Sequence, residues 1–488
     1  MENDNRPLLK LTVNTSDDAA EIIIVDGQYH EIADAVGKKA LFELPEGVYT
    51  VRLKAGTAME EQLVILRKDQ EINFDRIFFA SAAPLQGTSL THEFHMANAD
   101  NYSKNTSLAI GDGSEMYLFI RNWTGKTRPD KNPDFVNPAN GITLRDRNDN
   151  ILVDFEQASA ISPDPFDTWA ACNVRLAPGT YCLCQKVAND DTMRQTIVCC
   201  GGWQTQVFFF QQNADIQLRD PQKGLSNSAI FMTRIGMGFQ SQGKQNDYDG
   251  TADLRLTEFA RQGLLNERNV ISREVLNQMM NEKFDNPMLG IYAAHLLLLP
   301  KNRDESLARE IVMNLRKILN TPHPDVEALA LRLMMDSNYV FDMPPMLRRS
   351  WNFMLEASVK DSTKVPEDSL AADVAARLWC EDLWLLWGEP YETSLALETL
   401  VKQLTFFGQN QNYNIDAEMR RHQMSMNRNW DPDRRFYKYI AEENSAELNE
   451  SASNYNPNPL KIKDIVQSLG VPRSKVETML RNNNIHFE

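Results

Sequence analysis

The chain has 488 residues, of which 42% are hydrophobic and 24% are charged, and this composition is typical of a soluble globular protein and argues against a disordered one. Its formal net charge of −16 at pH 7 argues against a surface that binds nucleic acid over its whole length. No secretory leader and no apolar run long enough to span a bilayer is found in the sequence, so we expect a cytoplasmic protein with no membrane partner.

A chain of this length is too long for one core and predicts several folded units. We expect a multidomain β + α protein with two β-sandwich modules, an α-helical domain and a tethered C-terminal helical hairpin. The helical domain is either a HEAT-like solenoid or an irregular helical bundle. The expected boundaries are 1–80 for the first β-sandwich module, 81–110 for a connector, 111–216 for the second module, 217–253 for a connector loop, 254–410 for the helical domain, 411–441 for a basic and aromatic segment, 442–459 for a flexible tether and 460–488 for the hairpin.

The first eighty residues contain short β-branched segments bounded by Gly, Pro or Asp, which is the pattern of strands. These segments are LLKLTV (8–13), EIIIVDG (21–27), ALFELP (40–45), VYTVRL (48–53), QLVILR (62–67) and EINF (71–74). In the fourth segment Tyr49, Val51 and Leu53 share one face, so we expect these three side chains to be buried. Gly47 belongs to the turn that leads into this strand.

The sequence LPEGVYTVRL (44–53) is repeated in looser form as LAPGTYCLCQ (176–185). The neighbouring segments repeat as well, because QLVIL is followed about the same distance later by QTIVC (195–199). Upstream of the second copy, SEMYLFIRN (114–122) and ITLRDRNDNILVDF (142–155) take the places of the first two strands. The pattern predicts that a β-module has been duplicated.

The stretch L-P-x-G-x-Y-x-V and the V-x-L strand that follows it resemble the PEGA and prealbumin-like β-modules of bacterial proteins. The resemblance covers about forty residues in each copy. Such modules are mostly spacers and binding platforms, so the resemblance implies a β-sandwich and a binding role, and it implies no chemistry.

After residue 253 the apolar residues recur at i, i+3, i+4 and i+7, which predicts helices. The segments are LRLTEFARQGLL (254–265), SREVLNQMMNEKF (272–284), PMLGIYAAHLLLL (287–299), SLAREIVMNLRKIL (306–319), DVEALALRLMM (325–335), AADVAARLWCEDLWLLW (371–387) and SLALETLVKQLTFF (394–407). A faint repeat with a step of 37 residues, from Pro287 to Pro324, favours paired helices. His295 and the tryptophans at 379, 384 and 387 are expected to fill the core.

Five of the six cysteines cluster between residues 172 and 200. Cys182, Cys184 and Cys199 are weak candidates for a metal site, because thiols on neighbouring strands can hold zinc. Against this reading, the spacing C-x-C in a strand points both sulfurs the same way without curling the chain around an ion. Cysteine also packs well as a small core residue, and we expect no metal and no cofactor.

The segment 419–439 carries six basic residues against two acidic ones, with aromatic residues between them. Basic residues that hold phosphates and rings that stack bases are typical of single-stranded nucleic-acid binding. Aromatic residues beside arginine are also typical of protein interfaces, and an ordinary helix packed on the acidic body is a third reading. The candidate contact residues are Arg420, Arg421, Trp430, Arg434 and Arg435.

The last segment predicts two short helices separated by Gly470, which suits the left-handed conformation that ends a helix. Pro472 begins the second helix. The segment resembles the helix-turn-helix of bacterial DNA-binding proteins. By that resemblance the side chains that face a major groove are Arg473, Ser474, Lys475 and Thr478, and those near phosphates are Lys461, Lys463 and Arg481. The alternative is a hairpin that docks on protein or caps a domain.

The sequence contains no G-x-S-x-G motif and no Cys–His or paired-carboxylate arrangement that indicates catalysis. We therefore expect a non-enzymatic adaptor that binds partner proteins through its β-modules, helical domain and hairpin. From residue 419 onward the chain carries 11 Lys/Arg against 9 Asp/Glu, so an acidic body also has the charge to mask this tail. Two alternatives are a DNA-binding transcriptional regulator that uses the hairpin, and an enzyme with an unrecognised site in the helical domain.

Overall fold

The structure is a computed structural model of the chain. It describes residues 7–16, 20–55, 58–75, 80–85, 95–122, 137–162, 168–186, 192–211, 224–239, 252–268, 270, 272, 276, 286–300, 303–375, 378–379, 383–388, 462–463, 466 and 470–482. The chain divides into two compact units. The first comprises Met1–Tyr339, Pro345–Trp351 and Cys380–Leu386, and the second comprises Val340–Pro344, Asn352–Trp379 and Trp387–Glu488.

The described residues form four β-sheets together with helices, so the prediction of a multidomain β + α fold is confirmed in this general form. Within the same residues, no helix is both long enough and apolar enough to cross a membrane.

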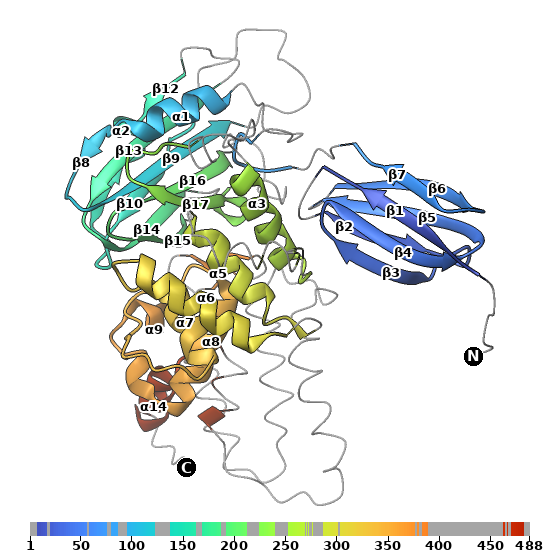
Figure 1. Ribbon diagram of the computed structural model, residues 1–488. Helices are drawn as coiled ribbons and strands as arrows, with labels where there is room; N and C mark the ends of the chain where they lie inside the picture. The colour runs from blue at the N-terminus through green and yellow to red at the C-terminus, as the bar shows by residue number, and fades with distance from the viewer. Residues whose placement is uncertain are drawn as a thin grey trace, which may run out of the picture. The chain divides into compact units, whose positions relative to one another are not determined.

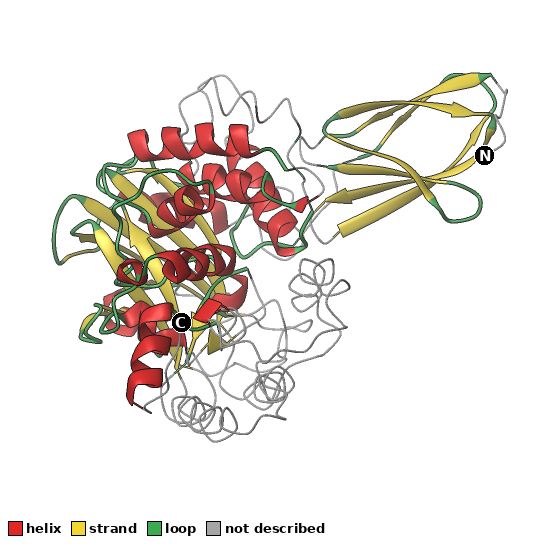
Figure 2. Ribbon diagram, turned by 90° about the horizontal axis from the view of Figure 1, so that it is seen from below, coloured by secondary structure: helices red, strands yellow, loops and turns green. Residues whose placement is uncertain are grey.

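The first module consists of strands joined by turns, and its described residues contain no helix (Figures 1 and 2). The strands are β1 (Leu8–Asn14), β2 (Glu21–Val25), β3 (Glu31–Val36), β4 (Lys39–Pro45), β5 (Gly47–Ala55), β6 (Ala58–Leu66) and β7 (Gln70–Asn73). One sheet has the order β4-β1-β7, with β1 antiparallel to β4 and parallel to β7. The other is antiparallel throughout, in the order β3-β2-β5-β6. All six predicted strands are present, and β3 is additional.

The two sheets of the first module contribute to one buried apolar cluster. Leu11 and Val13 of the first sheet join Ile22 and Ile24 of the second in this cluster. The predicted inner face of β5 is confirmed, because Tyr49, Val51 and Leu53 are only 6%, 0% and 1% exposed. Alternation of side chains along an extended strand places all three on the core side.

The same seven-strand arrangement occurs again between residues 114 and 211. Its strands are β9 (Ser114–Asn122), β10 (Ile142–Arg145), β11 (Ile151–Asp154), β13 (Trp169–Leu176), β14 (Gly179–Lys186), β15 (Thr192–Cys199) and β16 (Trp203–Gln211). Strand β9 is antiparallel to β13 and parallel to β16, as β1 is to β4 and β7. Strands β11-β10-β14-β15 repeat the antiparallel order β3-β2-β5-β6.

The turn between the first two strands of the antiparallel sheet is built in the same way in both copies. Asp26 Oδ1 accepts hydrogen bonds from the backbone N–H groups two and four residues later, and Asp146 Oδ1 does the same. Three residues after each aspartate, Tyr29 and Asp149 adopt the left-handed conformation, with φ of 66° and 68°. Asp and Asn side chains that bond the backbone ahead of them favour such turns.

The tyrosine of the repeated sequence also has the same partner in both copies. Tyr49 Oη donates to the carbonyl of Pro45 over 2.8 Å, and Tyr181 Oη donates to the carbonyl of Ala177 over 2.7 Å. The acceptor is four residues upstream each time, so the ring closes over the turn that precedes its strand. This bond gives a physical reason for the spacing that makes the two sequences alike.

The second copy carries additional elements. These are α1 (Met96–Lys104), β8 (Leu108–Ala109), α2 (Phe155–Ala158), β12 (Ala160–Ile161), η3 (Leu225–Asn227) and β17 (Ala229–Arg234). Strands β8, β12 and β17 extend the sheet that contains β9. Helix α1 and strand β8 lie in the segment 81–110 that was expected to be a connector, and β17 lies in the expected connector 217–253. The core beside this sheet is aromatic, with Phe119 stacked on Trp169 at 5.8 Å between ring centroids.

Four of the predicted helices follow in the first unit, whereas the predicted helix 272–284 lies outside the described residues except at 272 and 276. The four helices are α3 (Ala252–Leu265), α5 (Pro287–Leu296), α6 (Glu305–Ile318) and α7 (Pro324–Arg332). The 37-residue step from Pro287 to Pro324 marks two helix starts, because each proline occupies the first turn after a capping side chain, Asn286 and His323. His295 is fully buried in α5, and its Nε2 lies 3.0 Å from Ser350 Oγ, as expected for a core histidine.

The helix predicted over residues 371–387 is wrong for most of that range. Helix α9 (Leu370–Val374) is short, and the chain then forms two-residue strands, β18 (Leu378–Trp379) and β19 (Leu386–Trp387). Residues Leu383 to Trp387 are buried without interruption, which is the pattern of a buried strand rather than of an amphipathic helix. Trp384 is in the core as expected, and its Nε1 donates to the carbonyl of Ser228. The predicted helix 394–407 lies outside the described residues.

The second unit contains most of α8 (Arg348–Lys360), the short helix η5 (Ser362–Lys364), α9 and α14 (Arg473–Asn482). Asp361 caps η5 and Ser369 caps α9 through their side-chain oxygens. These elements form the surroundings of the C-terminal hairpin.

Candidate functional site

The C-terminal hairpin is described at residues 462–463, 466 and 470–482, and its turn is the predicted one. Gly470 has a φ of 64°, and its N–H donates to the carbonyl of Val466 over 2.9 Å. Helix α14 then begins at Arg473, directly after Pro472. The apolar residues Ile462, Val466, Val471 and Val476 are 6%, 0%, 1% and 3% exposed. The hairpin is therefore packed and is not a free appendage.

Arg473, the first residue of α14, is bound to the chain's own helical part. Its Nη1 donates to the carbonyl of Val359 over 2.7 Å, and its backbone N–H donates to Ser358 Oγ over 3.3 Å. Its Nε contacts Glu477 Oε1 at 2.6 Å. The guanidinium thus joins the end of α8 to the first turns of α14.

The other predicted groove-facing side chains have partners in the same unit. Ser474 Oγ donates to the carbonyl of Val365 over 2.6 Å. Lys475 Nζ lies 3.1 Å from Asp373 Oδ1 in α9, and Thr478 Oγ1 donates to Glu367 Oε2 over 2.6 Å. The face of α14 that was expected to meet DNA is therefore the face that contacts η5, α9 and the end of α8.

The remaining predicted contact residues differ in their placement. Arg481 is largely exposed and pairs with Glu477 at 3.3 Å, and Lys463 is exposed. Lys461 lies outside the described residues. So do the five candidates of the basic and aromatic segment, which are Arg420, Arg421, Trp430, Arg434 and Arg435.

Replacing Val476 by aspartate should release α14 from this docking site, because the new charge would be buried among apolar groups. We expect amide hydrogen exchange of residues 473–482 to accelerate by about tenfold or more, measured on the full chain by mass spectrometry. Arg481→Ala removes an exposed ion pair on the same helix and should leave the exchange unchanged. Equal exchange in both variants would show that α14 is held by something other than its buried face.

The described cysteines are all buried and free of disulfide bonds. Burial raises the pKa of the Cys172 and Cys200 thiols to about 12 and also raises the pKa of Cys199. The proposed grouping of Cys199 with Cys182 and Cys184 is not formed. Cys182 pairs with Thr196 across the sheet, and Cys199 lies an odd number of residues beyond Thr196, so it points to the other face. Among the described residues, no three His, Cys, Asp or Glu side chains are arranged to hold a metal ion.

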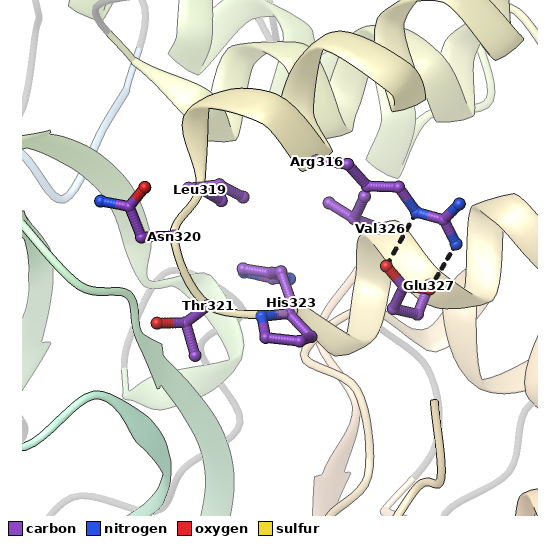
Figure 3. A pocket seen from close by; sticks show the side chains of 8 residues that line it. Arg316, Leu319, Asn320, Thr321, His323, Val326 and Glu327 are labelled. Atoms are coloured by element: carbon purple, nitrogen blue, oxygen red, sulfur yellow. Dashed lines mark hydrogen bonds and ion pairs between the residues drawn. The ribbon is translucent and has the colours of Figure 1, made fainter. Parts of the chain in front are cut away.

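A hollow of about 300 Å³ lies where α6 leads into α7 (Figure 3). Its lining residues are Arg316, Leu319, Asn320, Thr321, Pro322, His323, Val326 and Glu327. The charges of the hollow are paired, since Arg316 binds Glu327. Thr321 Oγ1 accepts from the N–H of Gly201. These polar groups are thus engaged within the protein, and no motif in the sequence marks the hollow.

His323 and Asp325 organise the start of α7 beside this hollow. His323 Nδ1 accepts from the N–H of Asp325, and burial lowers the pKa of this histidine to about 3, so the ring is neutral. The Asp325 carboxylate accepts from the N–H groups of Met346 and Leu347 over 2.9 and 2.8 Å, and burial raises its pKa to about 6. Both side chains accept hydrogen bonds from backbone N–H groups, so their role is structural.

The sheet edges of the two β-modules differ in a way that sequence reasoning missed. In the second copy β15 has a neighbour on both sides, because β19 pairs with it on the side away from β14. Strand β19 begins at Leu386 of the same unit. In the first copy β6 occupies the same position and is the last strand of its sheet among the described residues. On the outer face beside this edge, Val48, Leu63 and Ile65 are 48%, 67% and 55% exposed. The sequence signal for this exposed apolar face is the run QLVIL (62–66), because four consecutive apolar residues in a strand place apolar side chains on both of its faces.

No family model matches the chain, and no curated protein matches it significantly.

Proposed function

We propose that the protein is a non-enzymatic cytoplasmic adaptor whose first β-module receives a strand of a partner protein along β6. The observation that carries this proposal is the difference between the two copies of the module. The edge of β15 is paired with a strand from elsewhere in the chain, while the equivalent edge of β6 has no neighbour in the part of the chain that the structure describes. Addition of a strand to an open sheet edge is a common mode of peptide recognition.

The side chains beside the two edges support the same proposal. Leu63 and Ile65 of β6 correspond in register to Thr196 and Val198 of β15. The pair in the first copy is 67% and 55% exposed, whereas the pair in the second copy is 0% and 1% exposed. The outer face is thus covered in one copy and apolar and open in the other. An exposed apolar face beside a long edge strand marks either an interaction site or an aggregation hazard.

The charges of β6 indicate the chemistry of the partner strand. Glu60 and Glu61 precede the apolar residues, and Glu61 is already paired with Arg52 at 2.5 Å. A complementary strand therefore carries apolar side chains near Leu63 and Ile65 and a basic side chain near Glu60. Backbone hydrogen bonds along the edge supply affinity, and these side chains supply specificity.

The proposal also assigns an architecture to each part of the chain. We infer that each copy of the module is a β-sandwich, supported in the first by the cluster shared between its two sheets. The helices that follow act as a solenoid-like second surface, supported by the matching helix starts at Pro287 and Pro324. The hairpin serves as a docking element, supported by its contacts with Val359, Val365 and Asp373.

The full chain should bind a synthetic strand peptide that carries valines opposite Leu63 and Ile65 and a lysine opposite Glu60, measured by fluorescence anisotropy. The double variant Leu63→Glu, Ile65→Glu should weaken binding by about tenfold or more, because two apolar contacts are lost and the new carboxylates would have to give up water beside the valines of the peptide. The control is Leu41→Glu, which is equally exposed at 57% on β4 of the other sheet and should leave binding unchanged.

Three outcomes would overturn the proposal. The first is absence of peptide binding, or equal binding by the double variant. The second is a dimer of the wild-type chain in sedimentation that the double variant abolishes, because the occupant of the edge would then be a second copy. The third is salt-sensitive binding of DNA by the full chain that Arg473→Glu removes, which would favour a DNA-binding regulator.

A further inference from the structure

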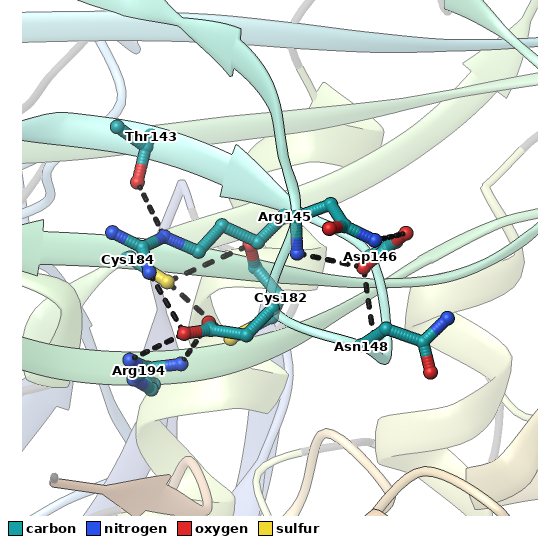
Figure 4. A network of polar contacts seen from close by, with 9 residues as sticks. Thr143, Arg145, Asp146, Asn148, Cys182, Cys184 and Arg194 are labelled. Atoms are coloured by element: carbon teal, nitrogen blue, oxygen red, sulfur yellow. Dashed lines mark hydrogen bonds and ion pairs between the residues drawn. The ribbon is translucent and has the colours of Figure 1, made fainter.

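We propose that Cys182 and Cys184 form a peroxide-reactive dithiol, in which Cys184 attacks the oxidant and Cys182 resolves the product as a disulfide. The two residues are separated by one position on β14, so their side chains lie on the same face of the sheet. Their sulfur atoms are 3.5 Å apart (Figure 4). Two thiols in direct contact are the starting geometry that disulfide formation requires.

Two arginines lie on the same face of the sheet. Arg194 of β15 is the direct cross-strand neighbour of Cys184, and Arg145 of β10 is the neighbour of Cys182. Asp149 lies between the two guanidinium groups, at 3.0 Å from Arg145 Nη1 and 2.5 Å from Arg194 Nη1. Two positive charges and one negative charge leave the surroundings of the sulfurs net positive, which stabilises a thiolate.

The first copy of the module shows which residues occupy the positions equivalent to Cys184 and Arg194. In the first copy the corresponding register position holds Arg52, which forms an ion pair with Glu61 at 2.5 Å. In the second copy Arg194 takes the place of Glu61, and Cys184 takes the place of Arg52. The cation of the cross-strand pair is therefore on the other strand, and the sulfur of Cys184 lies opposite the guanidinium of Arg194.

The pKa shifts of the two thiols also favour Cys184 as the thiolate and Cys182 as the neutral thiol. The hydrogen bond between the two thiols lowers the pKa of Cys184, and Arg194 and Arg145 lower it further. The same hydrogen bond and burial raise the pKa of Cys182. Burial raises the pKa of Cys172, Cys199 and Cys200, so Cys184 is the thiol of this group that ionises most readily.

The same surroundings disfavour a metal ion. A bound cation would lie beside two guanidinium groups, and Asp149, the nearby carboxylate, is already engaged by both. The site is therefore suited to an anionic sulfur and its oxidised forms, and not to zinc.

The proposed chemistry uses hydrogen peroxide as the oxidant. The Cys184 thiolate attacks one peroxide oxygen, the O–O bond breaks, and the departing hydroxide takes a proton to leave as water, giving a sulfenic acid. The Cys182 thiol then attacks the Cys184 sulfur, the S–O bond breaks, and a second water leaves with the thiol proton. In total two thiols are oxidised to one disulfide, and one peroxide is reduced to two waters.

Access and reversibility follow from the position of the pair. Cys182 and Cys184 are 2% and 1% exposed, and the ion-pair network beside them reaches the surface at Asp149, whose side chain is 51% exposed. An oxidant as small as peroxide can enter when this network opens. The sulfurs must approach from 3.5 Å to about 2.0 Å, so β14 has to bend when the bond forms. A disulfide formed in a bent strand is readily reduced by cellular thiols.

The test uses the full chain with Cys380→Ser, so that the five described cysteines remain. After limited peroxide treatment, we expect loss of two free thiols and a peptide with an internal Cys182–Cys184 disulfide, both identified by mass spectrometry. Before treatment, Cys184 should be alkylated about tenfold or more faster than Cys172, Cys199 or Cys200.

Variants separate the two roles. Cys182→Ser should leave a sulfenic acid on Cys184 that dimedone labels, and Cys184→Ser should abolish the reaction. Arg194→Gln should slow alkylation of Cys184, while Cys172→Ser should change nothing. The proposal is overturned if Cys184 reacts no faster than Cys199, if the wild-type product is an intermolecular disulfide, or if the purified protein holds stoichiometric zinc that peroxide releases. Measurements on the wild-type residues decide the matter even where a variant fails to fold.

Discussion

Replacing Arg261 by methionine should lower the free energy of unfolding by about 3–5 kcal/mol, because it would leave Glu258 buried without its ionic partner. Both residues lie in α3, one turn apart, with side chains 2% and 0% exposed. Arg261 Nε and Nη2 donate to the two carboxylate oxygens over 2.8 and 2.7 Å. An ion pair that is fully removed from water depends on both members, since neither has solvent to replace the other.

The double variant Glu258→Leu, Arg261→Met separates the cost of a broken pair from the value of the pair itself. We expect it to be close to the wild type in stability, because removing both charges also removes the cost of burying them. Gln262 loses its bond to Glu258 in this variant but keeps its bond to the carbonyl of Ala80 at 2.7 Å. Urea unfolding followed by circular dichroism measures both variants. Equal losses in the single and double variants would mean that packing, and not charge, sets the effect.

Replacing Asp325 by alanine should lower the free energy of unfolding by about 2–6 kcal/mol, at about 1–3 kcal/mol for each backbone donor left without a partner. The donors are the buried N–H groups of Met346 and Leu347, which Asp325 binds from the first turn of α7. Asp361→Ala is the matched control. Asp361 also accepts a backbone N–H bond, from Thr363, but it is exposed, and we expect a loss of about 1 kcal/mol there. A loss at Asp325 no larger than at Asp361 would contradict this account.

Asp325 and His323 should also change the free energy of unfolding in opposite directions as the pH rises. Burial raises the pKa of Asp325 to about 6, so the folded chain keeps a proton that the unfolded chain releases near its ordinary pKa of about 4. The stability from this group is therefore lost as the pH rises from about 4 to 6. Burial lowers the pKa of His323 to about 3, so its contribution rises with pH from about 3 towards 6.5.

Two variants separate these opposite slopes. Asp325→Asn should leave a free energy of unfolding that rises more steeply between pH 4 and 6 than in the wild type. His295, whose pKa is also lowered by burial, adds to that rise. His323→Asn, which keeps a capping side chain, should give a shallower rise or a fall over the same range. Urea unfolding across this range gives both slopes, and slopes equal to that of the wild type in both variants would contradict the assignment.

The features that could be predicted from the sequence are those that depend on residues close together along the chain. The alternation of Tyr49, Val51 and Leu53 placed β5 and its buried face, because burial on one side of a strand repeats every second residue. Gly470 ended its helix where a left-handed residue was needed. The duplication was visible because Tyr49 and Tyr181 each bind a carbonyl four residues away, within reach of a local pattern.

The features that sequence reasoning missed depend on distant partners. Trp384 and Trp387 fall at helical spacing, yet the chain is extended there, since burial on all sides leaves no periodic signal. Strand β3 was missed because its side chains are exposed or half-buried. The open edge of β6 and the pairing of Cys184 with Arg194 required the register of the sheets, which no single segment encodes.

The parallel pairing of β1 with β7 has a consequence for synthesis on the ribosome. Strand β1 is made before the other strands of its module, yet it is the central strand of its sheet, and one of its two neighbours ends only at Asn73. The nascent segment Leu8–Asn14 can therefore complete its pairing, in exchange for hydrogen bonds to water, only after residues 70–73 have left the exit tunnel. A truncation or tag that disturbs these seven residues would remove the middle of the sheet, and the earliest-made residues thus depend on the last ones of their module.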